Sequence, residues 1–425
     1  MQLQINNIGK VDNACIDING ITVIAGENNT GKSTISRALF SVFNSFYDVE
    51  RQIRKERISS INNISELWFR RPNLSFQTID ILSNTTNSII ENLDKYLDGT
   101  IDLEDIDNRI KNALEENGID TFDKEEVFVL IKRIKDSILV PKEELLKLIV
   151  TKKLNMEFNG QIDNIYSEDE GNIHLRIKDS DLIVSLVDNV VKEISNKNNL
   201  SLHLEAIYID DPFVIDSTRP LFYRRGFYPL GHREDLYYKI LRNTENNNLV
   251  DELITTNKLA NIYDKISSIC DGDVYNENNS KLLVYKSKGS DKTLDVRNLS
   301  TGLKTFVILK TLLLNGSIEA NGMIILDEPE IHLHPEWQLI FAEIIVLIQK
   351  EFGVHILLNT HSPYFLNAIE VYAEKYGIAK NCKYYLAETE GRFSHFKDVT
   401  DNVDEIYIKL SKPLQTLENQ RYSND

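Results

Sequence analysis

Three short stretches of this sequence carry side chains that could act on a phosphate anhydride. The first is Gly26–Ser33, Gly-Glu-Asn-Asn-Thr-Gly-Lys-Ser, which matches the pattern G-x-x-x-x-G-K-S. Backbone amides of such a loop and the positive end of a following helix hold phosphates, while Lys32 can reach the β and γ phosphates and Ser33 can bind magnesium. We expect a nucleotide and Mg²⁺ site that includes Gly26, Glu27, Asn28, Asn29, Thr30, Gly31, Lys32, Ser33 and Thr34.

Two further stretches supply acid, base and polar groups. Asp327 and Glu328 directly follow the apolar run 322–326, and His361 follows a second apolar run at 354–358. Asp327 can orient a magnesium ion that Ser33 also binds, and Glu328 can accept a proton from water that attacks the γ phosphate. A histidine at the end of a neighbouring strand can bond the γ phosphate. We expect Lys32, Glu328 and His361 to be the catalytic residues, with Ser33 and Asp327 as the metal ligands.

These side chains need strands and helices that place them together. The run 21–25 predicts a strand before the phosphate loop, and apolar residues at three- and four-residue spacing after Lys32 predict a helix. The continuous apolar runs 322–326 and 354–358 are typical of parallel strands covered on both faces. The fold class is therefore α/β, with a mixed or parallel sheet.

Composition and charge exclude several classes of protein. The chain has 425 residues, a net charge of −17 and a pI of about 5.0, so it lacks a global basic field for non-specific nucleic-acid binding. Its three cysteines are far apart, which argues against a disulfide framework and a zinc cluster. No apolar run approaches the ~18 residues of a membrane span, and the N-terminus begins as an alternating strand. We expect a cytoplasmic protein without a membrane partner.

The middle of the chain changes character. From about residue 79 to 154 the pattern is helical, with a D-x-x-E capping box at Asp123 and Glu126, which predicts an inserted helical lobe. We expect three segments: 1–80 and 201–425 as the two halves of a nucleotide-binding head, and 81–200 as the helical lobe with returning strands.

Several clusters have two readings. The basic run 51–57 and the Arg- and Tyr-rich stretch from Arg219 to His232 could contact DNA or RNA, but a solvated helix C-terminus and tyrosines packed on the core explain them better. Acidic pairs at 210–211 and 271–273 are better explained as turn or cap residues than as a nuclease metal site. His332 and His334 could bind metal, although they follow the Asp327-Glu328 stretch directly.

The order of these motifs resembles that of ABC-type ATPase heads, within the RecF, SMC and OLD-like group of AAA family ATPases. Gly26–Ser33 resembles a Walker A loop, Leu326–Glu330 a Walker B strand, and Thr360-His361-Ser362 a switch-histidine loop. The resemblance implies ATP and Mg²⁺ as cofactors, ATP hydrolysis, and a head-to-tail homodimer or higher oligomer. Each nucleotide would then also contact the partner's signature residues, which here are Ser300, Thr301 and Gly302.

The sequence departs from the family pattern at the signature and at the Q-loop. The signature reads Leu-Ser-Thr-Gly-Leu-Lys in place of Leu-Ser-Gly-Gly-Gln, and a Q-loop glutamine is not obvious, with Gln77 as a candidate. We expect no Toprim nuclease domain in the stretch that follows His361, because it is too short for that fold. Stand-alone ATPases of this kind resemble sensor subunits of bacterial anti-phage defence that act with a separately encoded effector. The alternatives are a RecF-like DNA-repair ATPase and a nucleotide-gated scaffold with little turnover.

Overall fold

The computed structural model describes residues 1–69, 75–117, 123–217, 231–242, 261–276 and 283–422, which form two compact units. The head unit comprises Met1–Tyr47 and the described chain from Val150 onward, and the helical unit is Asp48–Ile149. The expected boundaries after residues 80 and 200 differ from this division, because strands between residues 171 and 196 pair into the sheet of the head. No helix in the described ranges is long and apolar enough to cross a membrane.

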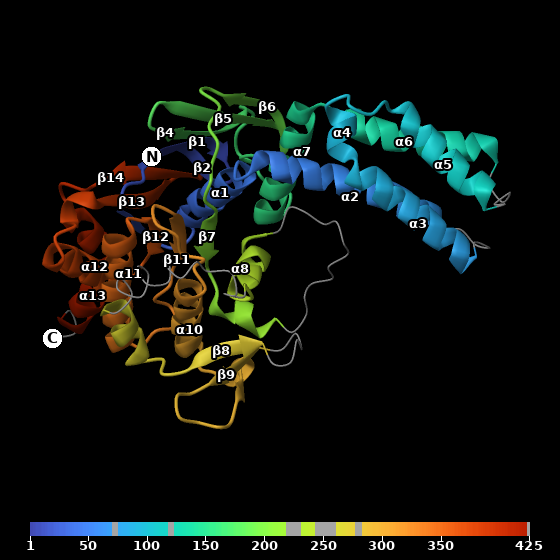
Figure 1. Cartoon of the computed structure of the whole chain (residues 1–425). Coiled ribbons are helices and arrows are strands. Elements are labelled where there is room, and N and C mark those ends of the chain that lie inside the picture. The colour runs from blue at the N-terminus through green and yellow to red at the C-terminus, as the bar shows by residue number, and fades with distance from the viewer. Residues whose placement is uncertain (70–74, 118–122, 218–230, 243–260, 277–282, 423–425) are drawn as a thin grey trace. The chain divides into compact units, whose positions relative to one another are not determined.

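The head unit is built on one eleven-stranded sheet, shown in Figure 1. Its strands are β1 (Gln2–Ile8), β2 (Val11–Asp17), β3 (Ile21–Gly26), β4 (Gly171–Ile177), β5 (Ser180–Val187), β6 (Val190–Asn196), β7 (Ala206–Ile209), β11 (Met323–Asp327), β12 (His355–Thr360), β13 (Cys382–Glu390) and β14 (Phe393–Asp398). The spatial order is β6-β5-β4-β1-β2-β14-β13-β3-β12-β11-β7. The predicted strands before the phosphate loop, before Asp327 and before His361 are therefore all present.

The sheet has a parallel half and a largely antiparallel half. Strands β13, β3, β12, β11 and β7 run parallel, whereas β1, β2, β4, β5 and β6 pair antiparallel with one another. Because carboxyl ends of parallel strands meet at one edge of a sheet, the residues after β3, β12, β11 and β7 come together there. Each of the three predicted functional stretches follows one of these strands.

Helices cover the parallel strands. α1 (Lys32–Ser45) follows the phosphate loop and lies against β3, β12, β11 and β7. One apolar cluster joins β3 and β11 to α8 (His232–Ile240), α10 (Thr301–Leu314), α11 (Pro335–Phe352) and α12 (Pro363–Lys375). β3 is buried along its whole length. This rigid layer fixes the positions from which the functional side chains project.

The rest of the head consists of short elements around this core. A second sheet has the order β10-β9-β8, in which β9 pairs antiparallel with β10. The bounds are β8 (Asp273–Asn276), β9 (Leu283–Lys286), β10 (Leu294–Asp295), η1 (Pro212–Asp216), η3 (Val296–Asn298), η4 (Ala379–Asn381) and α13 (Asp404–Tyr422). α7 (Lys142–Phe158) begins in the helical unit and ends in the head.

The helical unit is the predicted inserted lobe. It contains α2 (Val49–Phe69), α3 (Phe76–Glu91), α4 (Leu93–Leu97), α5 (Glu104–Glu116) and α6 (Lys124–Leu139). In Figure 1 α2 lies along α3 and α6, and α5 lies along α3 and α6. Apolar residues at helical spacing, such as Ile106, Ile110 and Leu114 on α5, form their shared core. Asp123 caps α6, as its sequence context predicts.

The basic run 51–57 does not lie at a helix C-terminus. α1 ends at Ser45, Asp48 has a φ of +42°, and α2 begins at Val49, so the run lies in the first half of a second helix. Arg57 is buried, with 3% of its surface exposed, and donates hydrogen bonds to the carbonyl oxygens of Ser137, Ile138 and Val140 at the end of α6. The expected solvated basic face is therefore wrong for Arg57, which satisfies carbonyls that a helix end leaves without partners.

Candidate nucleotide-binding site

The predicted phosphate loop connects β3 to α1 in a conformation that depends on glycine. Gly31 has a φ of +80° and Asn29 a φ of +63°, both in the left-handed region. A Cβ atom on Gly26 would lie 2.3 Å from the carbonyl oxygen of Ala387 on the neighbouring strand β13. Left-handed residues turn successive backbone N–H groups toward one concave side, which suits an anion at the start of a helix.

Lys32 is the first residue of α1 and folds back over the loop. Its Nζ donates to the carbonyl oxygens of Gly26 at 3.0 Å and Glu27 at 2.8 Å, and it lies 4.0 Å from Oε1 of Glu328. Burial lowers the pKa of Lys32, while the carboxylates of Glu328 and Asp327 act in the opposite direction. The ammonium group of Lys32 is thus held against the backbone of the loop and near the carboxylate of Glu328.

The other predicted loop residues differ in how deeply they are buried. Thr30 is buried and its hydroxyl donates to the carbonyl oxygen of Glu27 at 2.8 Å, which braces the turn. Glu27, Asn28 and Asn29 are exposed, and Ser33 and Thr34 are half-buried at the start of α1. Exposed loop amides and a half-buried Ser33 hydroxyl leave this surface accessible to a ligand.

Strand register brings the acidic stretch and the histidine to the loop. Thr360 at the end of β12 pairs with Ala25 of β3, and Asp327 at the end of β11 pairs with Asn359 of β12. The residues that follow these strands, Glu328 and His361, therefore lie beside Lys32. The predicted catalytic residues meet at one edge of the sheet, although Lys32 lies 296 positions before Glu328 and 329 positions before His361 in the chain.

Glu328 has a backbone conformation that non-glycine residues rarely adopt. Its φ is +52°, and its N–H donates to the carbonyl oxygen of Asn359 at 2.9 Å. Strained residues of this kind cluster at functional sites. Oε1 of Glu328 lies 3.4 Å from Nδ1 of His361, and this contact lowers the pKa of Glu328 and raises the pKa of His361. Glu328 is therefore ionised near neutral pH, which is the form that accepts a proton.

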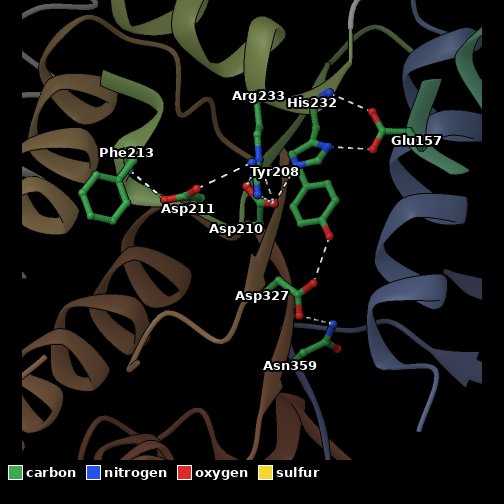
Figure 2. A network of polar contacts seen from close by, with 9 residues as sticks. All are labelled: Glu157, Tyr208, Asp210, Asp211, Phe213, His232, Arg233, Asp327 and Asn359. Carbon is green, nitrogen blue, oxygen red and sulfur yellow. Dashed lines mark hydrogen bonds and ion pairs between the residues drawn. The ribbon is translucent and has the colours of Figure 1, made fainter. Parts of the chain in front are cut away.

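Asp327 is a buried carboxylate held by two neutral donors. The Tyr208 hydroxyl donates to its Oδ2 at 3.0 Å and the Asn359 amide donates to its Oδ1 at 2.9 Å (Figure 2). Among the residues that the structure describes, no basic side chain forms an ion pair with Asp327. A buried charge normally has a compensating partner, so the donor set of Asp327 and Ser33 fits a hard divalent cation such as Mg²⁺.

Glu330 fixes the loop that carries the histidine. Its Oε1 accepts hydrogen bonds from the Thr360 hydroxyl and, at 3.3 Å, from the backbone N–H of His361. Only 2% of Glu330 is exposed, and burial raises its pKa. The residue three positions after Asp327 thus sets the position of His361 relative to Glu328.

The signature stretch begins α10. Ser300 is exposed and caps this helix, because its hydroxyl accepts a hydrogen bond from the N–H of Leu303 at 3.4 Å. Thr301 starts the helix, and a Cβ atom on Gly302 would lie 3.0 Å from the carbonyl oxygen of His332. Glycine at 302 therefore allows α10 to pack closely on the segment after β11. Because Ser300 is exposed, the N-terminus of α10 lies at the surface.

Some residues of the clusters with two readings make structural contacts in the described part of the chain. Asp211 caps η1 by accepting from the N–H of Phe213, Asp210 pairs with Arg233, and no group of three or more described His, Cys, Asp or Glu side chains could hold a metal ion. His332 packs its ring edge against Phe213. The predicted basic stretch at 219–230 lies outside the described residues, and Gln77 lies on α3 of the helical unit.

Sequence reasoning did not identify Tyr208 and Asn359. Each is the second-last residue of a strand next to β11: Tyr208 interrupts the apolar strand β7, and Asn359 directly follows the apolar run Ile356–Leu358 of β12. A polar side chain inside a fully buried strand needs a partner, and this was the available signal. The partner, Asp327, becomes apparent only once the strand order is known.

Comparison with known proteins identifies the family. Residues 1–366 of the 425 match the family described as the AAA ATPase domain. The chain belongs to this family. The α/β fold and the ATPase family predicted from the sequence are both confirmed.

Two related proteins are described as ATPases of retrons. The chain is 32% identical over 87 residues to the retron Vc95 probable ATPase of Vibrio cholerae serotype O1 biovar El Tor, covering 18% of this chain and 16% of that protein. It is 29% identical over 154 residues to the retron Ec83 probable ATPase of Escherichia coli, covering 34% of this chain and 27% of that protein. The chain thus spans less than a third of the length of these relatives.

Solved structures of SMC heads also align with the chain. The SMC head domain from Thermotoga maritima aligns with a TM-score of 0.38 and 12% identity, over 94% of this chain and 98% of that chain. The Smc head domain with a coiled coil and joint derived from Pyrococcus yayanosii aligns with a TM-score of 0.38 and 10% identity, over 97% and 99%. The family assignment rests on the sequence match alone.

Proposed function

We propose that the protein binds ATP with Mg²⁺ and hydrolyses the bond between the β and γ phosphates. The observation that supports this most strongly is the meeting of a lysine, a glutamate and a histidine side chain beside the phosphate loop. Oε1 of Glu328 lies 4.0 Å from Nζ of Lys32 and 3.4 Å from Nδ1 of His361. A base, a phosphate-binding cation and a polar sensor at this spacing fit phosphoryl transfer to water.

The residues of the chain divide the work of this reaction. The loop amides and the N-terminus of α1 hold the phosphates, and Lys32 neutralises charge on the β and γ phosphates. Glu328 accepts a proton as the oxygen of water forms a bond to the γ phosphorus. The bond from that phosphorus to the bridging oxygen breaks, and its electron pair leaves with ADP. Ser33 and Asp327 would hold Mg²⁺, which supplies charge neutralisation between the phosphates when bound.

ATP acts in this proposal as the link between two heads. The exposed Ser300 and the N-terminal amides of α10 would complete the nucleotide site of a second copy, head to tail, with Thr301 and Gly302 beside them. A phosphate loop leaves one side of the nucleotide open to water, whereas the charge on the γ phosphoryl group calls for donors on both sides. Hydrolysis would then open the dimer and reset the switch.

The biological setting proposed is bacterial anti-phage defence. The two relatives described as probable retron ATPases support this setting by analogy. In it the ATPase senses a nucleic acid or phage component and releases a separately encoded effector. A RecF-like repair role and a slow scaffold role remain the alternatives, and the identity of the neighbouring genes discriminates the first of them.

Steady-state hydrolysis tests the enzymatic part. The wild type should release phosphate from ATP only with Mg²⁺, Lys32→Ala should lose at least ~100-fold of this rate, and Lys412→Ala, at an exposed lysine of α13, should match the wild type. Tight ATP binding without turnover in the wild type would favour the scaffold, and equal turnover in Lys32→Ala would contradict the site.

The defence part needs a separate test. Bacteria that express the chain with its neighbouring genes should form fewer plaques when challenged with phage, and Lys32→Ala should abolish the protection while Lys412→Ala retains it. Protection that persists in Lys32→Ala would contradict a nucleotide-driven switch.

A further inference from the structure

A chain of largely buried side chains leads away from the proposed magnesium carboxylate, Asp327 (Figure 2). It runs from Asp327 to Tyr208 on β7, then to His232 at the start of α8, and ends at Glu157 of α7 and Asp210 after β7. All of these residues belong to the head unit. None of them is needed by the reaction as described above except Asp327.

His232 is clamped between two carboxylates. Its Nδ1 contacts Oε2 of Glu157 at 2.6 Å, and its backbone N–H donates to Oε1 of the same residue at 2.7 Å. Its Nε2 lies 3.0 Å from Oδ2 of Asp210, which Arg233 also contacts at 2.7 Å. Burial alone would lower the pKa of His232, but the two carboxylates outweigh it and raise the pKa to about 9. The ring is therefore an imidazolium, and each of its nitrogens lies within 3.0 Å of a carboxylate oxygen.

Tyr208 is held by this imidazolium. The two rings stack at a centroid distance of 4.2 Å and an interplanar angle of 24°, and Phe40 of α1 contacts both rings from the side. Tyr208 has 1% of its surface exposed, so its ring cannot turn without displacing these neighbours. The position of its hydroxyl, and with it the hydrogen bond to Asp327, follows from the position of His232.

Burying these ionised side chains costs folding free energy, so their presence calls for an explanation. Buried ionic groups lose hydration, and apolar residues of similar volume are often at least as stabilising. Partners that orient a metal-binding carboxylate, in contrast, typically change metal affinity when they are removed. The network begins at Asp327, the carboxylate whose orientation the reaction requires, and this placement favours a role in orienting Asp327 over a purely stabilising role.

We propose that Tyr208 and His232 are positioning residues for Asp327, which fix its carboxylate so that it can bind the magnesium of the nucleotide. The Tyr208 hydroxyl and the Asn359 amide each hold one oxygen, at 3.0 and 2.9 Å, so the carboxylate plane is set from both sides. Because Asp210 and Glu157 hold His232, the turn after β7 is tied to the metal-binding residue. This inference rests on the proposed ATP and Mg²⁺ site.

The test removes one oxygen atom. Tyr208→Phe keeps the ring and its stacking and deletes the hydrogen bond to Asp327, whereas Tyr285→Phe deletes the hydroxyl of another buried tyrosine, on β9, which donates to Asp271. Tyr208→Phe should raise the KM for Mg²⁺ in ATP hydrolysis about tenfold and change kcat much less. Tyr285→Phe should leave both values unchanged.

A binding measurement independent of turnover accompanies the kinetics. Mn²⁺ is titrated into each protein with a non-hydrolysable ATP analogue and followed by electron paramagnetic resonance, and its Kd should rise about tenfold in Tyr208→Phe alone. Unchanged metal affinity in folded Tyr208→Phe would overturn the proposal. If that variant is recovered unfolded, His232→Gln takes its place in both titrations, and unchanged metal affinity there would overturn it equally. A wild type that fails to bind the ATP analogue would instead contradict the proposed function.

Discussion

The charge on His232 makes a measurable contribution to stability that depends on pH. His232→Gln is the perturbation, because glutamine retains a donor but cannot carry the charge. The pKa of His232 is about 9 in the folded protein and about 6.5 in an unfolded chain. A shift of this size corresponds to roughly 3 kcal/mol of stability, at about 1.4 kcal/mol per pKa unit. Its side chain is 12% exposed, so solvent screens this interaction little.

The sign follows from the direction of the shift. Because the folded state binds the proton more tightly, the contribution is complete below about pH 6.5 and is lost as pH rises through about 9. The pKa of Asp210 is held near 2 despite its burial, so Asp210 stays ionised throughout this window. Burial lowers the pKa of Lys153, which interacts with Glu157 and is present in both proteins.

The assay is urea unfolding of wild type and His232→Gln at intervals from pH 6 to 9.5. The difference in unfolding free energy should shrink by about 3 kcal/mol across this range. His355→Gln is the control, because burial lowers the pKa of His355, and its difference from wild type should be constant above about pH 7. A difference for His232→Gln that does not vary with pH would refute the assignment of a buried imidazolium.

Two further predictions concern the dimer and the helical unit. Lys32→Ala and Ser300→Arg should each be inactive alone, but mixing the two proteins should restore part of the ATP hydrolysis. The reason is that one of the two composite sites in a mixed dimer carries neither defect. A mixture that stays inactive while native mass spectrometry detects mixed dimers would contradict independent sites completed in trans. Arg57→Met should lower the free energy of unfolding by about 2–4 kcal/mol, because buried carbonyl oxygens lose their donor, whereas exposed Arg51→Met should change it by less than ~0.5 kcal/mol. Equal stability of the two arginine variants in urea unfolding would show that Arg57 does not hold the end of α6.

The sequence predicts the parts of the head whose patterns are strong. Continuous apolar runs predicted β3, β11 and β12, and the G-x-x-x-x-G-K-S pattern placed Lys32 at the start of α1. Weak patterns did not reveal β6, an edge strand with exposed polar residues, or β14, which is short and half polar. α12 was also not predicted, although Ser362 caps it and Pro363 begins it, which is a recognisable start signal.

The sequence predicts the residues of the candidate site but not the side chains that hold them in place. Lys32, Glu328 and His361 follow from local motifs, because each motif lies at the end of its own strand. The bond from Tyr208 to Asp327 joins residues 119 positions apart and depends on β7 lying next to β11, which no local pattern specifies. The left-handed Glu328 donates a backbone hydrogen bond to Asn359 on β12, a contact that likewise exists only in the assembled sheet.

The central claim is that Glu328 is the base for ATP hydrolysis, and single-turnover kinetics of Glu328→Gln test it most directly. The amide keeps the size of the side chain and cannot accept the proton. Glu328→Gln should bind ATP with Mg²⁺ as tightly as the wild type in equilibrium titration, but cleave the bound ATP about 10²- to 10⁴-fold more slowly. Cleavage of bound ATP at the wild-type rate would contradict the assignment and place the base elsewhere.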